Sequence, residues 1–141
     1  MNDCQYQIMI EITALFETDS ADYGFSVCTA TPDNQGISAG FIQFTTCGGA
    51  AAQVCETYEQ LYQQQFGQSS FCAAYTDALQ QAIGASYCTD GSMNAYTPSG
   101  LESFCSDWTA EATGPNASLF AQAQKTIQFN AYFEKLQTGV L

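Results

Sequence analysis

The chain contains no histidine and very few basic residues. Lys125 and Lys135 stand against 14 acidic residues, which gives a formal net charge of −12 over 141 residues. A surface this acidic repels nucleic acids and anionic membranes and attracts cationic partners. The same charge would also serve simply to keep a secreted protein soluble. We therefore expect no nucleic-acid partner, and a cationic polymer is the partner to test.

Long apolar runs are also absent. No stretch reaches the roughly 18 consecutive apolar residues that a membrane span needs, so we expect no membrane partner. The start, from Met1 to Cys4, lacks the basic and apolar regions of a signal peptide and is typical of a mature form with an added methionine. With 46% hydrophobic and 13% aromatic residues, the chain can bury a core. Its length predicts a single domain, residues 1–141.

The seven cysteines are spread along the chain without a CxxC motif. Without histidine, a zinc site would need thiolates or carboxylates alone, and the spacings do not indicate one, so we expect neither a metal nor a cofactor. Disulfides in an oxidising compartment are the better interpretation. Seven cysteines predict three bridges of undetermined connectivity and one unpaired thiol, through which copies could associate. The sequon Asn116-Ala117-Ser118 agrees with a secreted, extracellular protein.

Periodicity predicts a mainly helical α+β domain with a small β element near residues 23–44. Residues 23–29 have the pattern of a short strand, residues 31–36 have turn chemistry, and residues 40–44 fit either a strand or the start of a helix. Residues 84–99 are rich in small polar residues and predict a long loop. Apolar residues at helical spacing predict helices over 5–17, 50–66, 70–83, 100–112 and 117–137.

Two carboxylates stand out near the N-terminus. Glu17 ends the first apolar helix, and Asp33 opens a turn that a glycine-spaced apolar segment follows. Apolar neighbours favour a protonated Glu17, whereas a polar turn favours an ionised Asp33. One protonated and one ionised acid facing each other across a cleft is the arrangement that glycoside hydrolysis requires.

These stretches resemble the chitosanases of glycoside hydrolase family 46, within the lysozyme-like superfamily. The family has Ser-Ile-Phe-Glu where this chain has Ala14 to Glu17. It has Asp-Gly-Arg-Gly-Tyr-Thr-Ala-Gly-Ile-Ile-Gly-Phe where this chain runs from Asp33 to Phe44. The resemblance implies a disulfide-stapled, lysozyme-like helical domain, shorter than the family's members and lacking most of their second lobe.

The resemblance also implies roles for individual residues. Glu17 falls on the general acid, Asp33 on the general base that activates water, and Ser38 on a hydroxyl that helps hold this water. Tyr23 and Gln35 are candidate substrate-binding residues, and Gln35 stands where the family has arginine. We thus expect inverting endo-hydrolysis of β-1,4-linked glucosamine polymers such as chitosan.

Two other classes of protein remain open. One is a non-catalytic extracellular protein on the same fold, either a carbohydrate binder or a self-assembling structural subunit. The short length, the many small polar residues and the odd cysteine favour it. The other is a peptidoglycan hydrolase, which the negative charge disfavours because bacterial walls are anionic.

Overall fold

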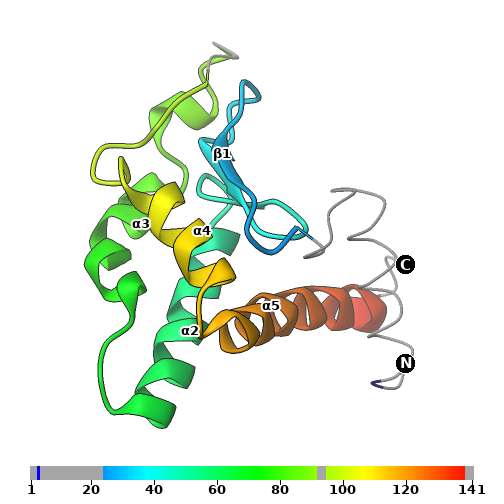
Figure 1. Cartoon of the computed structure of the whole chain (residues 1–141). Coiled ribbons are helices and arrows are strands. Elements are labelled where there is room, and N and C mark those ends of the chain that lie inside the picture. The colour runs from blue at the N-terminus through cyan, green and yellow to red at the C-terminus, as the bar shows by residue number, and fades with distance from the viewer. Residues whose placement is uncertain (1–2, 4–23, 92–94, 139–141) are drawn as a thin grey trace.

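The computed structural model describes residue 3, residues 24–91 and residues 95–138. Within them, a small antiparallel sheet packs against a set of helices (Figure 1). The strands are β1 (Cys28–Ala30), β2 (Ile37–Ala39) and β3 (Phe44–Thr45). The helices are α2 (Ala50–Phe66), the 3-10 turn η1 (Phe71–Tyr75), α3 (Thr76–Ala82), the 3-10 turn η2 (Ser86–Cys88), α4 (Phe104–Thr113) and α5 (Ala117–Thr138). The mainly helical α+β class and the small β element are confirmed.

The sheet has the order β1-β2-β3, with Cys28 opposite Ala39 and Ser38 opposite Thr45. The strand predicted over 23–29 begins only at Cys28, because Gly24 has a φ of 83° and opens a turn closed by Val27 N–H on the Gly24 carbonyl. The ambiguous segment 40–44 is a turn that ends in β3. Tight turns on both sides therefore keep each strand to two or three residues.

The helices follow the predicted pattern with two differences. α2 has the expected bounds, and α5 begins at the expected residue. The region 70–83 starts as the 3-10 turn η1, whose N-cap Ser70 accepts a hydrogen bond from the backbone of Cys72. α4 starts at Phe104 rather than near residue 100, because Gly100 has a φ of 87°, which no right-handed helix allows. The helix predicted over 5–17 lies outside the described residues.

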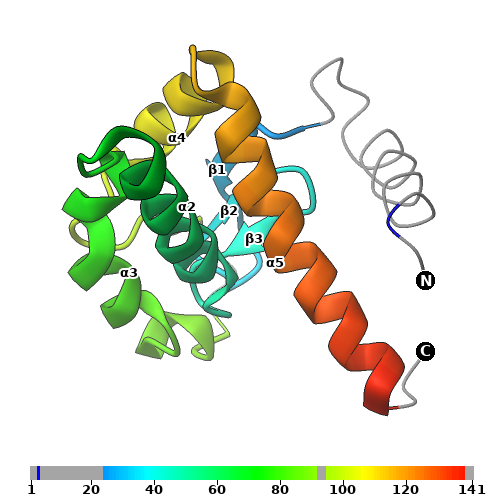
Figure 2. The same ribbon diagram turned by 90° about the horizontal axis from the view of Figure 1, so that it is seen from below.

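The core lies where α2, α4 and α5 meet beneath the sheet (Figure 2). Aromatic rings fill it: Trp108 and Tyr58 each pack on Phe120, with centroids 4.6 and 4.8 Å apart, and all three are fully buried. Trp108 is therefore a core residue, as its helical spacing predicts. No helix in the described ranges is both long enough and apolar enough to cross a membrane.

A buried amide fastens the β element to the helices. Gln124 of α5 is fully buried; its Oε1 accepts from Phe41 N–H at 3.2 Å, and its Nε2 donates to the Phe25 carbonyl at 3.1 Å. The indole of Trp108 donates to the same carbonyl at 3.0 Å. A Cβ on Gly40 would lie 2.5 Å from Gln124 Oε1, so this close approach requires glycine. The segment before β1 and the turn after β2 are thereby held on α4 and α5.

Disulfides supply a second set of links. Cys28–Cys105 joins β1 to α4, Cys47–Cys88 joins the end of the sheet to η2, and Cys55–Cys72 joins α2 to η1. The expectation of three bridges is confirmed, and they fit an oxidising compartment. The seventh cysteine, Cys4, lies outside the described residues. Two of the three bridges end on the β element, which fixes its position relative to the helices.

Candidate functional site

The tip of the β1–β2 hairpin carries Asp33. The hairpin is closed by Thr31 N–H on the Gly36 carbonyl at 3.2 Å, and Asn34 and Gly36 take φ values of 63° and 74°. Asn and Gly tolerate this left-handed region better than other residues do. The sequence Pro-Asp-Asn-Gln-Gly therefore folds locally into a tight turn that leaves the Asp33 carboxylate exposed.

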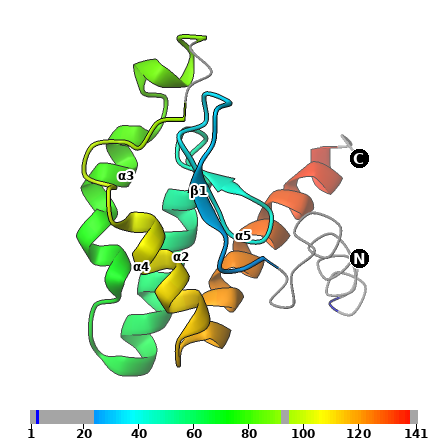
Figure 3. The same ribbon diagram turned by 45° about the horizontal axis from the view of Figure 1, so that its top comes forward.

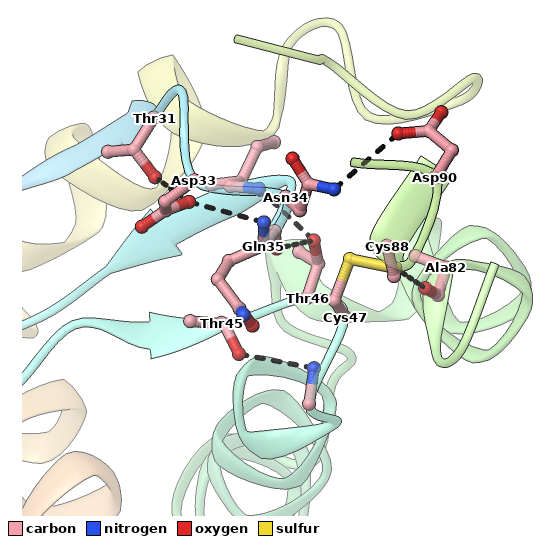
Figure 4. Close-up of a disulfide and its surroundings, with 12 residues drawn as sticks. Thr31, Asp33, Asn34, Gln35, Thr45, Thr46, Cys47, Ala82, Cys88 and Asp90 are labelled. Carbon is pink, nitrogen blue, oxygen red and sulfur yellow. Dashed lines mark hydrogen bonds between the residues drawn. A yellow bond between two sulfur atoms is a disulfide. The ribbon is translucent and has the colours of Figure 1, made fainter. Parts of the chain in front are cut away.

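One carboxylate oxygen of Asp33 is held by two donors. Its Oδ1 accepts the Thr31 hydroxyl at 2.7 Å and the Gln35 backbone N–H at 3.2 Å (Figure 4). Both bonds that Asp33 accepts within the described residues end on this oxygen. The arrangement fixes the side chain, and Oδ2 accepts no hydrogen bond from the described residues.

Ser38 is a residue of β2, the second strand of the hairpin that carries Asp33. Its side chain is buried, with 3% of its surface exposed, and its Oγ lies 3.4 Å from the Thr31 hydroxyl. No described hydrogen bond joins Ser38 directly to Asp33. Thr31 connects the two predicted residues, so the site consists of a carboxylate and two hydroxyls in a row.

The hydroxyl of Thr46 holds the backbone of the turn in place. This hydroxyl donates to the Gln35 carbonyl at 3.3 Å and accepts from Ile37 N–H at 3.1 Å. The Cys47 N–H reaches the same Gln35 carbonyl at 3.2 Å. A Cβ on Gly36 would lie 2.5 Å from Thr46 Oγ1, so the turn lies closely on this hydroxyl. These contacts make the hairpin tip a rigid support for Asp33.

A second segment of the chain lies beside the hairpin. Residues 83–91, which follow α3, run alongside the tip in two views (Figures 1 and 3). Asn34 Nδ2 donates to Asp90 Oδ1 at 3.5 Å, and the Cys47–Cys88 disulfide ties the segment to the sheet. Two carboxylates, Asp33 and Asp90, thus flank Asn34, and an edge of this charge suits an ammonium-bearing ligand.

The predicted residues fall into two groups. Asp33 and Ser38 come together through Thr31, and Gln35 contributes its backbone N–H to Asp33 and its carbonyl to Thr46. Glu17 and Tyr23 lie outside the described residues. Thr31, Thr46 and Asp90 were missed by sequence reasoning. Only Thr31 carried a signal, as a hydroxyl two residues before the predicted base, the spacing at which side chains in a turn meet.

Comparison with known proteins identifies a solved structure with a similar fold. No protein-family model matches the sequence, and no curated protein matches it. Among solved structures, the chain is similar to the GH46 chitosanase of Gynuella sunshinyii, solved in complex with chitotetraose, with a TM-score of 0.66 and 18% identity. The match covers 100% of this chain and 54% of that chain, so this chain spans about half the length of its neighbour. The fold is therefore a lysozyme-like α+β fold of the kind found in that chitosanase.

Proposed function

We propose that this protein is an endo-acting glycoside hydrolase that cleaves β-1,4-linked glucosamine polymers with inversion of configuration. The observation that carries the proposal is the held carboxylate of Asp33, with its Thr31 and Ser38 hydroxyls, on a fold shared with a chitosanase. The net charge of −12 supports a cationic polysaccharide as substrate. The three disulfides support a secreted protein.

In this proposal, Asp33 is the general base. Thr31 and Gln35 hold Oδ1, and Oδ2 accepts the proton of a water molecule that attacks the anomeric carbon. Glu17 is the general acid that protonates the leaving oxygen. Inversion requires roughly 6.5–9.5 Å between the two carboxyls, because the water must fit between Asp33 and the sugar. Ser38 acts through Thr31, while Tyr23 and Gln35 contribute to substrate binding.

The test is hydrolysis of a glucosamine hexamer by the wild type and by Asp33→Asn, followed by NMR of fresh products. We expect the α-anomer first from the wild type, because water attacks the face opposite the leaving group. Asp33→Asn should lose at least roughly 10²-fold in kcat and still bind the hexamer, since a positioned general base contributes about that factor. Glu17→Gln should lose activity similarly.

Asp77→Asn is the matched control. Asp77 is an exposed aspartate at the start of α3, so this variant makes the same charge change outside the candidate site. Full activity in Asp33→Asn would remove Asp33 from the reaction and leave it as a turn-forming residue. A β-anomer appearing first would mean retention and would overturn the assignment of a general base.

The second candidate is a non-catalytic carbohydrate-binding or self-assembling structural protein on the same fold. The observation that favours it is that Asp33 has the hydrogen bonds of a turn-forming residue, since its Oδ1 accepts from Thr31 and Gln35 of the same turn. This candidate predicts hexamer binding, or concentration-dependent assembly, with no product from correctly folded wild-type protein. The same NMR experiment therefore distinguishes the two functions.

A further inference from the structure

A pair of stacked tyrosines lies next to the Asp33 turn and has no part in the proposed chemistry. The rings of Tyr87 and Tyr96 are 4.1 Å apart between centroids and within 25° of parallel. Tyr96 is 45% exposed, one of the most exposed large hydrophobic residues of the described chain. A flat aromatic ring that is supported from behind and open to solvent is a preformed surface for stacking.

The pair is joined to the candidate site by direct contacts. A Cβ on Gly36 would lie 3.4 Å from the Tyr87 ring, so Tyr87 packs on the turn that carries Asp33. The Cys47–Cys88 disulfide fixes the residue after Tyr87, and Asp90 accepts from Asn34 of the same turn. The tyrosine pair and Asp33 are therefore carried by adjoining segments that are held together.

The pair also borders a hollow of about 250 Å³. Alanines of α3 and Pro98 give it an apolar floor, and Gln81 and Ser99 bring an amide and a hydroxyl to its rim. Sites for small ligands combine apolar and aromatic walls with a few polar groups in this way. A pyranose ring has matching chemistry, with an apolar C–H face for the aromatic ring and hydroxyls around its edge.

We infer that Tyr96, supported by Tyr87, forms a sugar-binding subsite that stacks one glucosamine unit of the polymer beside the Asp33 turn. The occupant is an amino sugar because its C–H face can stack on the ring while the ammonium group at its edge is attracted to the carboxylate of Asp90, three residues after Tyr87. This inference rests on the proposed substrate class. It assigns the subsite binding and no step of the reaction.

The test measures binding of the glucosamine hexamer by calorimetry in the non-hydrolysing Asp33→Asn background. Adding Tyr96→Ala should weaken binding by roughly 2- to 12-fold, the range expected for loss of one aromatic stacking contact. Tyr96→Phe should retain the affinity, because the ring remains. Phe66→Ala is the matched control, since Phe66 is a 41% exposed aromatic at the far end of α2.

The outcomes separate the two proposals. Unchanged hexamer binding in Tyr96→Ala, with hydrolysis intact in the otherwise wild-type protein, would overturn the subsite and leave the proposed function standing. Equal weakening in Phe66→Ala would also overturn it, because the effect would not belong to this surface. If the hexamer neither binds to nor is cleaved by the wild type, the proposed function fails first and the subsite with it.

Discussion

Thr31 is the residue that joins the parts of the candidate site, because its hydroxyl contacts both Asp33 and Ser38. We expect Thr31→Val to lower kcat about 10-fold or less with little change in KM, since it acts through Asp33 and leaves substrate contacts in place. Thr31→Ser should restore kcat, because it keeps the hydroxyl. Steady-state kinetics on the glucosamine hexamer check this. A rise in KM without a fall in kcat would contradict a positioning role.

The sequence predicted the residues of this turn better than their connections. Pro32 and Gly36 mark the turn directly, and Asp33 follows from the resemblance. The role of Thr31 depends on the register of the hairpin, which places it across from Gly36 and diagonal to Ser38. Side-chain neighbours of this kind arise from three-dimensional pairing and leave no periodicity in the chain. Tyr87 and Tyr96 were missed for the same reason, since they meet only across a loop.

At the scale of elements, Glu59 links α2 to η1. Its carboxylate accepts the backbone N–H of Ser70 at 2.8 Å and also the Ser70 hydroxyl, while Gln63 donates to it from within α2. Partial burial raises the pKa of Glu59, but the hydrogen bonds from Ser70 and Gln63 outweigh this effect and lower the pKa below its ordinary 4.5. The ionised form is therefore the one that holds η1 on α2.

The sign of this shift sets a pH dependence. A carboxyl whose pKa is lowered in the folded state stabilises it above the unfolded pKa, and the contribution disappears as pH falls through the lower folded pKa. We expect Glu59→Gln to lower the melting temperature at pH 7 and the difference from wild type to shrink below about pH 4.5. Thermal unfolding from pH 7 to pH 3 measures it.

Glu56→Gln is the control, because Glu56 is an exposed glutamate one turn earlier in the same helix. A difference between Glu59→Gln and wild type that stays constant down to pH 3 would mean that the carboxylate is not what stabilises η1.

The helices were predictable to different degrees for physical reasons. α2 matches its expected bounds because glycines with left-handed φ, Gly49 and Gly67, mark both ends in the sequence. α4 begins late because Gly100 and the Pro98 turn override the apolar spacing of the residues around them. The short β2 carried no alternating pattern long enough to detect, and disulfide pairing depends on the spatial approach of distant segments.

At the scale of the whole molecule, the net charge of −12 attracts a polycation. The Debye length, over which salt screens charges, shortens from about 8 Å at physiological ionic strength to about 3 Å at 1 M. We therefore expect the affinity for the glucosamine hexamer to fall as salt increases. Titrations at several NaCl concentrations measure the slope, with the uncharged N-acetylated hexamer as the control. An equal affinity for the glucosamine hexamer at low and high salt would exclude charge as the driving force.

The Cys28–Cys105 bridge determines what happens to the protein after a protease cuts its backbone. It spans 77 positions, including both other disulfides and the whole segment between α3 and α4. Any single backbone cut between these two cysteines leaves both fragments covalently joined, so a nicked molecule migrates as one species until it is reduced. Exposed loops are where proteases cut first. The loop that carries Tyr96 can thus be cleaved without separating it from the hairpin that carries Asp33, which is a useful property for a protein that would work outside the cell.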